Sequence, residues 1–345
     1  MNGRTQHRSW ILGIHGRAAG AALALAIILL LAVFATGSAQ AQTYTESVLY
    51  SFKGVTDGDG YYPTAGLVQD AQGNLYGTTD QGGASYYGTV FKLDTTGNET
   101  VLYSFKVGTD GYYPEAGLVQ DGQGNLYGTT YAGGDLACSF GNGCGTVFKL
   151  DTTGKETVFY SFTGVGGDGA DPQAGLVRDA QGNLYGTAGG GGDLACDPPN
   201  GCGTVFKVDT TGKETVLYSF KGSPDGHQPL AGLVRDAQGN LYGTTHEGGD
   251  LPCELPVGCG TVFKLDTTGK ETVLHSFTGN PDGRFPYAGL VQDAQGNLYG
   301  TTVQGGDLAC NGDCGTVFKV DTTGKETVLY SFTGTGGTAH IPRQV

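Results

Sequence analysis

The stretch "GTVFKLDTTGKETVFYSF", Gly145–Phe162, decides the fold. Two runs rich in Val, Phe, Tyr and Thr, which favour strands, flank the turn "TTGK". Gly154 in this turn can adopt the positive φ of a short hairpin, which a residue with a Cβ would resist. In the second run, alternation places Val158, Tyr160 and Phe162 on one face. The stretch therefore predicts an antiparallel β-hairpin.

This hairpin is half of a unit that recurs five times along the chain. "GNLYGT" recurs at spacings of 51, 58, 57 and 57 residues, with its leucine at Leu75, Leu126, Leu184, Leu241 and Leu298. "GTVFK" follows each copy, starting at Gly88, Gly145, Gly203, Gly260 and Gly315. Most of the length variation lies in the loop between these two motifs, called here the variable loop. With "AGLVQD" before "GNLYGT", each unit carries four strand-like segments.

Four strands repeated at a period of about 57 residues predict an all-β chain, a β-propeller of about five four-stranded antiparallel blades. A lone blade cannot bury its faces, whereas neighbours packed face to face can. The alternatives are an open array of four-stranded units, a β-solenoid, or part of a larger ring, because a leading strand leaves one strand surplus in a closed ring. We expect one repeat domain at 42–333, with a leading strand at 46–52, blades at 64–106, 115–163, 173–221, 230–278 and 287–333, and a tail at 334–345.

The run "GLVQDAQGNLYGTT…GTVFKLDTTGKETVLYSF" resembles the GloVer tandem repeat of secreted bacterial proteins that carry a choice of C-terminal anchors. It also resembles, more loosely, the NHL-type propeller repeat. The resemblance covers nearly all of 46–332 and implies a secreted or surface propeller-like protein, with no catalytic residues to carry over. The tail "TGTGGTAHIPRQV" shows neither an apolar anchor nor a sorting signal, so free secretion or a truncated reading frame stays open beside surface attachment.

Residues 1–41 predict a secretory signal peptide. Arg4, Arg8 and Arg17 form a basic start, an apolar run covers Ala18–Gly37, and "AQA" at Ala39–Ala41 offers a cleavage site. The alternative is an uncleaved membrane anchor, since twenty apolar residues can span a bilayer. The small residues at the cleavage position favour removal, so we expect a secreted or cell-surface protein without membrane insertion.

The acidity of the chain excludes two classes of partner. Without the three leader arginines, 16 basic residues face 33 acidic ones, a net charge of −17. Such a protein repels nucleic acid and anionic lipid.

The eight cysteines all lie in the variable loops, in pairs. An oxidising compartment favours disulfides, and a structural zinc site needs four protein ligands whereas one pair supplies two. The variable loop of the first repeat is shorter and has no cysteine, so it needs no cross-link. We predict the disulfides Cys138–Cys144, Cys196–Cys202, Cys253–Cys259 and Cys310–Cys314, and no metal site.

A second loop, called here the DGP loop, keeps the frame D-G-x-x-P-x-A-G while its x positions change. Varied loops on a rigid scaffold commonly form binding faces, and aromatic residues suit sugars or protein surfaces. The alternative is that these aromatic residues only pack between blades. The predicted binding residues are Tyr61, Tyr62, Tyr112, Tyr113, His227, Arg284, Phe285 and Tyr287.

Aspartates in the same loops suggest calcium binding as an alternative role for these loops. The pattern D-x-D-G falls short of the EF-hand pattern, however. No other cofactor is expected. The aspartates of these loops are Asp57, Asp59, Asp110, Asp168, Asp171, Asp225 and Asp282. Aspartates repeated elsewhere, such as Asp121 and Asp151, precede turns and can accept backbone N–H bonds.

No nucleophile signature, H-E-x-x-H, P-loop or Rossmann fingerprint is present, so no catalytic residue is assigned. The main expectation is a secreted, non-enzymatic binding or interaction module for an extracellular polysaccharide or protein. One alternative is a secreted propeller hydrolase or lyase that uses residues differing between repeats, such as His227, His246, Glu247 and Arg284. Another is a structural envelope or matrix protein. His275 replaces a strand tyrosine and is interpreted as a packing variant.

Overall fold

The computed structural model describes residues 47–54, 58–250, 253, 257–307 and 314–333. The predicted signal peptide and the tail at 334–345 lie outside the described residues. Two compact units are distinguished, Met1–Val48 and Leu49–Val345, and every assigned strand lies in the second. Within the described ranges, no helix is long and apolar enough to span a bilayer.

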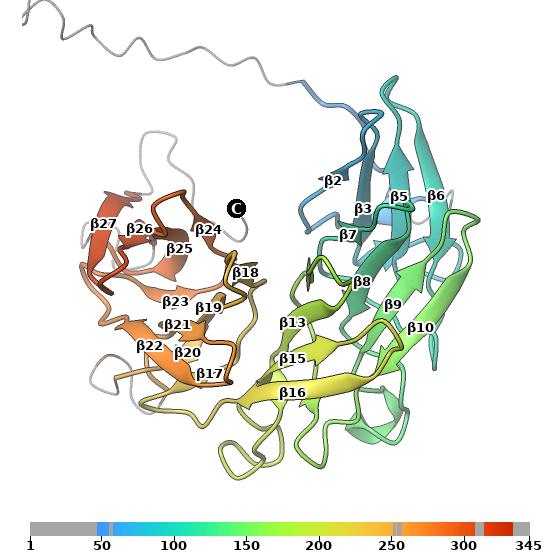
Figure 1. Cartoon of the computed structure of the whole chain (residues 1–345). Helices are drawn as coiled ribbons and strands as arrows, with labels where there is room; N and C mark the ends of the chain where they lie inside the picture. The colour runs from blue at the N-terminus through green and yellow to red at the C-terminus, as the bar shows by residue number, and fades with distance from the viewer. Residues whose placement is uncertain (1–46, 55–57, 251–252, 254–256, 308–313, 334–345) are drawn as a thin grey trace, which may run out of the picture. The chain divides into compact units, whose positions relative to one another are not determined.

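Each repeat forms one antiparallel sheet, and the sheets follow one another in chain order (Figure 1). This confirms the predicted all-β fold of repeated four-stranded blades. The strands are β2 (Val68–Gln69), β3 (Leu75–Thr79), β5 (Thr89–Leu93) and β6 (Glu99–Ser104); β7 (Val119–Gln120), β8 (Leu126–Thr130), β9 (Thr146–Leu150) and β10 (Glu156–Ser161); β12 (Val177–Arg178), β13 (Leu184–Ala188), β15 (Thr204–Val208) and β16 (Glu214–Ser219); β18 (Val234–Arg235), β19 (Leu241–Thr245), β21 (Thr261–Leu265) and β22 (Glu271–Ser276); β24 (Val291–Gln292), β25 (Leu298–Gln304), β26 (Thr316–Val320) and β27 (Glu326–Ser331).

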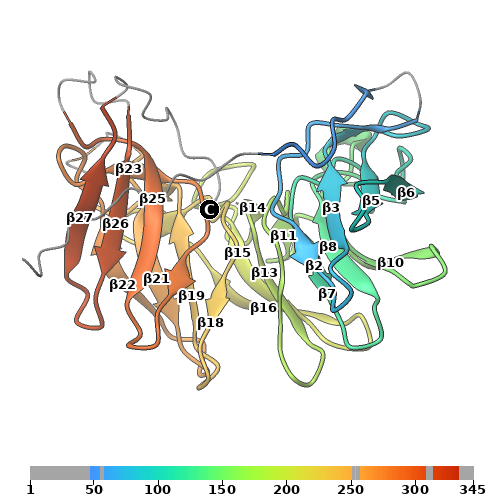
Figure 2. The ribbon, with the colours of Figure 1, turned by 90° about the horizontal axis from the view of Figure 1, so that it is seen from above.

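The strand of "GTVFK" lies inside each sheet, between the second and fourth strands (Figure 2). In β9, Val147, Phe148 and Leu150 are buried, as expected for the middle of a packed sheet. The hairpin expected from Gly145–Phe162 is present as the β9–β10 pair. A bulge between Val158 and Tyr160 interrupts the expected alternation in β10.

Consecutive sheets pack through pairs of phenylalanines. Phe105, which follows β6, lies edge-on to Phe148 of β9 with ring centroids 5.1 Å apart. The same contact joins each sheet to the next, with centroid distances of 4.9–5.1 Å, in Phe162–Phe206, Phe220–Phe263 and Phe277–Phe318. Each fully buried phenylalanine contributes roughly 1.5–3 kcal/mol by leaving water. The hydrophobic core therefore lies between sheets rather than within one.

The leading segment differs from the expectation at 46–52, since residues 47–52 form no strand. No described strand lies beside it to complete a ladder, because the first three strands of its own unit do not precede it. Its rings still make the contacts of the repeat, with Phe52 lying 5.0 Å from Phe91. Among the described residues no strand joins the first sheet to the last, so the sheets are open.

Short two-stranded ribbons pair the DGP loop of each repeat with the variable loop of the same repeat, an arrangement that the sequence did not predict. In the second repeat a single bridge joins Tyr112 to Ala132, and a 3-10 turn, η2 (Ser139–Gly141), follows in its variable loop. The two-stranded ribbons pair β1 (Gly60–Tyr61) with β4 (Gln81–Gly82), β11 (Gly169–Ala170) with β14 (Gly190–Gly191), and β17 (Gly226–His227) with β20 (Glu247–Gly248). In the fifth repeat β23 (Arg284–Pro286) instead pairs with an extended β25 and so belongs to a five-stranded sheet. Both variable segments of a repeat are thereby held together.

Candidate functional site

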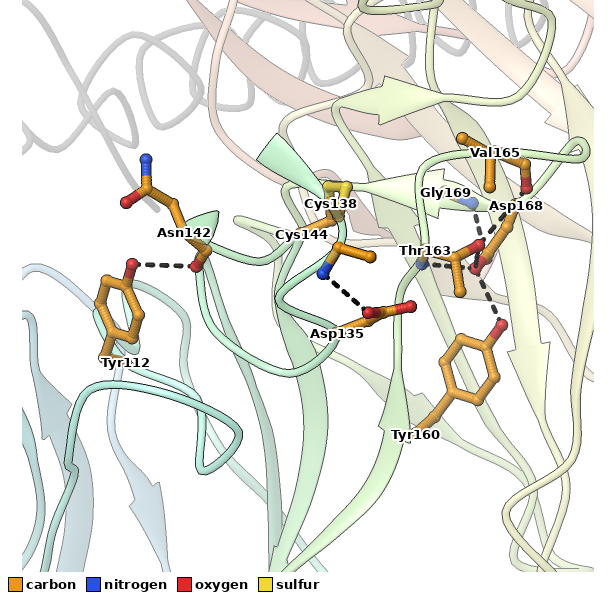
Figure 3. Close-up of a disulfide and its surroundings, with 11 residues drawn as sticks. Tyr112, Asp135, Cys138, Asn142, Cys144, Tyr160, Thr163, Val165, Asp168 and Gly169 are labelled. Atoms are coloured by element: carbon orange, nitrogen blue, oxygen red, sulfur yellow. Dashed lines mark hydrogen bonds between the residues drawn. A yellow bond between two sulfur atoms is a disulfide. The ribbon is translucent and has the colours of Figure 1, made fainter. Parts of the chain in front are cut away.

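Disulfides close the variable loops of repeats 2, 3 and 4, as predicted. Cys138–Cys144, Cys196–Cys202 and Cys253–Cys259 are bonded, with Cα–Cα distances of 5.6, 5.8 and 5.7 Å. Figure 3 shows the first of these, with Asp135 accepting the N–H of Ala137 beside it. The fourth predicted pair, Cys310–Cys314, includes Cys310, which lies outside the described residues. These cross-links indicate an oxidising compartment.

A strained backbone position recurs next to the disulfides. The residue before the proline of the DGP loop has a φ of 54–59° in all five repeats, although non-glycine residues rarely adopt this region. In the third repeat this residue is Asp171, whose N–H donates to the carbonyl of Cys144 in the second repeat, 3.0 Å away. Its own carbonyl accepts the N–H of Gly189 at 3.1 Å. Bonds on both sides hold this conformation, whose five instances are Tyr62, Tyr113, Asp171, Gln228 and Phe285.

The segments that follow these prolines line a cavity of about 520 Å³. The residue directly after the proline differs in every repeat, and all five contribute it to the wall: Thr64, Glu115, Gln173, Leu230 and Tyr287. The glycines of successive P-x-A-G segments lie against each other, and a Cβ on Gly117 would come within 3.1 Å of the carbonyl of Gly66. Small residues therefore let the repeats converge, while one variable side chain per repeat determines the chemistry of the wall.

Glu115 is the most perturbed group in this cavity. Burial, reinforced by the negative charges of Asp80 and Asp171, raises its pKa to about 7, against a hydrogen bond from Gln173 that lowers it. The Gln173 Nε2 donates to Glu115 Oε2 at 3.1 Å and so connects the second and third repeats. A carboxyl group with a pKa near neutrality can both accept and donate a proton under physiological conditions.

Two further carboxyls belong to the same electrostatic cluster. Burial raises the pKa of Asp171 to about 6. Burial also raises the pKa of Asp80, against a hydrogen bond from Gln81. Neighbouring acids with different pKa values can divide the roles of acid and base.

An aromatic group borders the carboxyls. Burial, and then the charges of Asp171 and Glu115, raise the pKa of Tyr131. His246 stacks on Phe285 with centroids 5.0 Å apart and meets the ring of Tyr287 edge-on at 5.8 Å. Burial lowers the pKa of His246, which therefore favours its neutral form. Tyr287 lines the cavity together with the carboxyls of Asp80 and Glu115, so the cavity wall has both aromatic and acidic parts.

A groove of about 780 Å³ shares part of its wall with the cavity, through Gln173 and Leu230. The disulfide of Cys138 forms one side of the groove, and Gly189 and Gly190 form another. The positions of these glycines hold side chains in the other repeats, for example His246 and Glu247 in the fourth. A Cβ on Gly189 would lie 2.8 Å from Leu230 Cδ2. The groove is therefore open because the third repeat has glycines, without side chains, at these two positions.

The predicted binding residues separate into three places. Tyr61 and Tyr62 are 41% and 49% exposed, with rings 3.9 Å apart. Tyr112 is 7% exposed and belongs to the core, where its hydroxyl donates to the carbonyl of Asn142, and Tyr113 packs partly buried against that cluster.

The remaining four lie in repeats 4 and 5. Arg284 lies over the ring of Phe285, 5.5 Å from its centroid, and Tyr287 reaches the cavity. The His227 Nδ1 lies 3.0 Å from a Glu247 carboxylate oxygen. The structure therefore brings Phe285, Tyr287 and His246 together.

Five of the DGP-loop aspartates that suggested calcium accept hydrogen bonds from the segment that precedes their own repeat. Asp168 accepts the hydroxyl of Tyr160 at 2.9 Å and the N–H groups of Thr163 and Gly169 at 2.8 and 2.7 Å (Figure 3). Corresponding contacts are made by Asp59, Asp110, Asp225 and Asp282. Asp57 lies outside the described residues.

Sequence reasoning missed Glu115, Asp80, Gln173 and Asp171 as one cluster. The available signal was the position after the proline, which varies in all five copies while its neighbours stay constant. Of the predicted binding residues, Tyr287 occupies this position, whereas the others lie before the proline. The convergence of one residue per repeat depends on packing between sheets, which the pattern of a single repeat does not contain.

The Gloeobacter/Verrucomicrobia repeat model matches residues 32–254 and 141–344 of this sequence. The chain belongs to this repeat family. This confirms the suspected GloVer resemblance. No curated protein matches the sequence significantly.

Several solved structures are similar to this Gloeobacter/Verrucomicrobia repeat protein. A gluconolactonase from Xanthomonas campestris is 16% identical, with a TM-score of 0.44 and coverage of 82% of this chain and 80% of that one. The periplasmic gluconolactonase of Pseudomonas aeruginosa is 16% identical, with a TM-score of 0.46 and coverage of 79% and 71%. A luciferin-regenerating enzyme is 15% identical, with a TM-score of 0.45 and coverage of 82% and 78%.

These findings correct the main functional expectation. The expectation of a non-enzymatic binding module is corrected, since the similar solved structures are enzymes; at 15–16% identity the likeness is one of fold and assigns no activity to this chain. At this level of similarity the substrates of those enzymes do not transfer to this chain. Its chemistry has to be argued from its own cavity.

Proposed function

We propose that this chain is a secreted enzyme, a hydrolase or lyase, that works by general acid–base catalysis in the cavity lined by all five repeats. The observation that carries the proposal is Glu115, a half-buried carboxyl in the cavity wall with a pKa of about 7. Such a pKa maximises the product of proton availability and proton-transfer driving force at neutral pH. Perturbed acids in a concave site are typical of catalytic groups.

The roles of the carboxyls follow from their pKa order. At pH 7, Asp171 with a pKa of about 6 is mostly ionised, whereas Glu115 with a pKa of about 7 is half protonated. In hydrolysis, Asp171, which lines the adjoining groove, takes a proton from the attacking water while the water oxygen bonds to the electrophilic carbon. Glu115 gives its proton to the leaving oxygen as the bond to that carbon breaks. In a lyase, the same base would remove a carbon-bound proton and the same acid would protonate the leaving group.

The wall of the cavity supports an uncharged, hydroxyl-bearing substrate of carbohydrate type. The carboxyls repel anions, and the Gln173 amide and Thr64 hydroxyl offer neutral hydrogen-bonding groups. The ring of Tyr287 supplies an apolar face of the kind on which sugar rings pack. An extracellular polysaccharide or a fragment of one is therefore the proposed substrate class.

Secretion is part of the proposal. The signal-peptide pattern at 1–41 and the disulfides of repeats 2–4 support export to an oxidising compartment.

The test is an activity screen of the exported, oxidised protein against chromogenic glycosides, chromogenic esters, sugar lactones and neutral polysaccharides. Each substrate found is then assayed with Glu115→Gln, and removal of the general acid is expected to lower kcat by about 10²–10⁴-fold. The wild-type pH profile is expected to have a limb near pH 7 that disappears in the variant.

A matched control is Glu271→Gln. Glu271 also has a pKa raised to about 7 by burial and then by Asp225, but it does not line the cavity. The Glu271→Gln variant should retain wild-type activity. Equal activity of Glu115→Gln and wild type, or no turnover in the screen, would overturn the proposal.

A further inference from the structure

A three-residue arrangement recurs between consecutive sheets, separate from the cavity. A tyrosine at the next-to-last position of the fourth strand donates its hydroxyl to the aspartate of the DGP loop that follows. The glutamate that begins the fourth strand of the next repeat faces the same aspartate. In the second and third repeats, the Tyr160 hydroxyl donates to Asp168 at 2.9 Å, and the charge of Asp168 acts on Glu214. The arrangement occurs as Tyr50–Asp59–Glu99, Tyr103–Asp110–Glu156, Tyr160–Asp168–Glu214 and Tyr218–Asp225–Glu271.

The copy between the fourth and fifth repeats differs in one residue. His275 stands where the other described copies have tyrosine, beside Asp282 and Glu326. One ligand atom from each of these three side chains lies within 4.8 Å of the other two. The exchange of phenol for imidazole replaces a group that stays protonated near pH 7 with one whose neutral form offers a lone pair.

The geometry fits two ligands of one metal ion. The His275 Nε2 lies 3.2 and 3.3 Å from the two Asp282 oxygens. Ligands at about 2.0 Å from a tetrahedral ion are separated by about 3.3 Å. The Asp282 carboxylate is held in place by the N–H of Thr278 at 2.7 Å and its hydroxyl at 3.0 Å. Such bonds behind a ligand orient it toward a metal.

The third side chain, Glu326, has a carboxylate oxygen that is free to bind a metal ion. Glu326 Oε1 is buried and accepts no hydrogen bond from any residue that the structure describes, as is also true of the equivalent Oε1 atoms of Glu99, Glu156, Glu214 and Glu271, so the difference in this copy is the imidazole of His275. Two carboxylates that face each other repel unless a proton or a cation lies between them. The His275 and Asp282 side chains are 18% and 12% exposed, so an ion can reach the site and yet be shielded there.

From this arrangement we infer that His275, Asp282 and Glu326 form a binding site for one divalent first-row transition-metal ion, with Zn²⁺ as the representative. One nitrogen and two carboxylate oxygens suit such an ion, whereas Ca²⁺ and Mg²⁺ prefer oxygen ligands throughout. Three protein ligands leave at least one position for water. The site connects the fourth repeat to the fifth, so the bound ion stabilises their packing.

The repeat supplies its own controls for the test. The full exported protein is stripped with a chelator and titrated with Zn²⁺ by calorimetry and with Co²⁺ by visible absorption. The wild type is expected to bind one equivalent and to show a higher melting temperature with Zn²⁺. His275→Tyr introduces the residue that the other described copies carry. This variant should therefore fold normally and no longer bind the one equivalent of metal ion.

The converse variant is Tyr218→His, which recreates the three-ligand set with Asp225 and Glu271. It is expected to bind a second equivalent of Co²⁺. Zn²⁺ binding that is unchanged in His275→Tyr would place the ion elsewhere and overturn the inference. Absence of binding by the wild-type protein, with a melting temperature unaffected by Zn²⁺, would also overturn it.

Discussion

The N–H of Asp171 donates to the carbonyl of Cys144, 3.0 Å away, and this bond connects a disulfide of the second repeat to a carboxyl of the third that lines the groove. Gln228 and Phe285 make the corresponding bonds to Cys202 and Cys259, at 3.1 and 2.9 Å. The second cysteine of each disulfide thus provides the carbonyl that the strained residue of the next repeat contacts. After the first repeat, which has no disulfide, the carbonyl of Tyr87 accepts the N–H of Tyr113 in the same way, at 3.1 Å.

Removing one disulfide should therefore affect both stability and the site. Cys138→Ala with Cys144→Ala is expected to lower the free energy of unfolding by about 2 kcal/mol, the chain-entropy value for a seven-residue loop. The freed carbonyl should also loosen Asp171 and lower catalytic activity. Urea denaturation and the assays above measure the two effects. Cys253→Ala with Cys259→Ala is the control, because the carbonyl of Cys259 holds Phe285 and not a carboxyl; equal activity loss in both would contradict the link.

Stability should decrease as the pH rises through neutrality. Burial, and then Asp110, raise the pKa of Glu156 to about 8 from an ordinary value of 4.5. The folded state therefore keeps a proton that the unfolded state loses, so this stabilisation is complete below about pH 4.5 and disappears by about pH 8. Glu156→Gln is expected to be more stable than wild type at pH 8 and similar at pH 5, in urea melts. Asp250→Asn, at an exposed position, tests whether loss of one negative charge explains the gain.

The repeated turn aspartates should act on stability and not on activity. Asp121 Oδ1 accepts the N–H groups of Gln123 and Asn125, both at 2.9 Å, and its Oδ2 accepts the Tyr127 hydroxyl at 3.1 Å. Asp121→Ala is expected to cost about 2–3 kcal/mol in chemical denaturation, because buried donors lose a charged acceptor. A smaller cost is expected for Asp151→Ala, whose partners are solvent-exposed. Loss of turnover by folded Asp121→Ala would assign this residue a functional role.

Filling the groove should change substrate size preference. Gly190 has no positive φ, and its position holds glutamine in the first and fifth repeats, so Gly190→Gln is expected to fold normally. The side chain would occupy the groove beside Asn200 and lower kcat/KM at least about tenfold for oligomeric substrates, with little effect on small ones. The control is Gln304→Gly, which changes the equivalent position in the fifth repeat, away from this groove. A uniform loss across substrate sizes would point instead to a disturbed cavity.

The sheets could be predicted from sequence because their signals are local. Alternating residues in "GTVFK" and "ETVFYSF" and the glycine turn between them specify a hairpin without further context. The cysteine pairs were readable for the same reason, since both partners lie in one loop.

The cavity could not be predicted in the same way. A residue before proline ordinarily prefers extended conformations, so the positive φ of Asp171 contradicts its local preference. Hydrogen bonds to Cys144 in the preceding repeat and from Gly189 impose it, and these come from segments distant in sequence. The perturbation of Glu115 likewise depends on Asp80 in the first repeat and Gln173 in the third.

The position after each proline gives this cavity an unusual genetic property. Each repeat encodes one wall residue in an otherwise constant frame, from Thr64 in the first to Tyr287 in the fifth. Unequal recombination between such similar units adds, deletes or exchanges a wall residue in one event, with the sheets left intact. Catalytic composition and scaffold are thus inherited through different positions of the same repeat, and new specificities can arise by shuffling units as well as by point mutation.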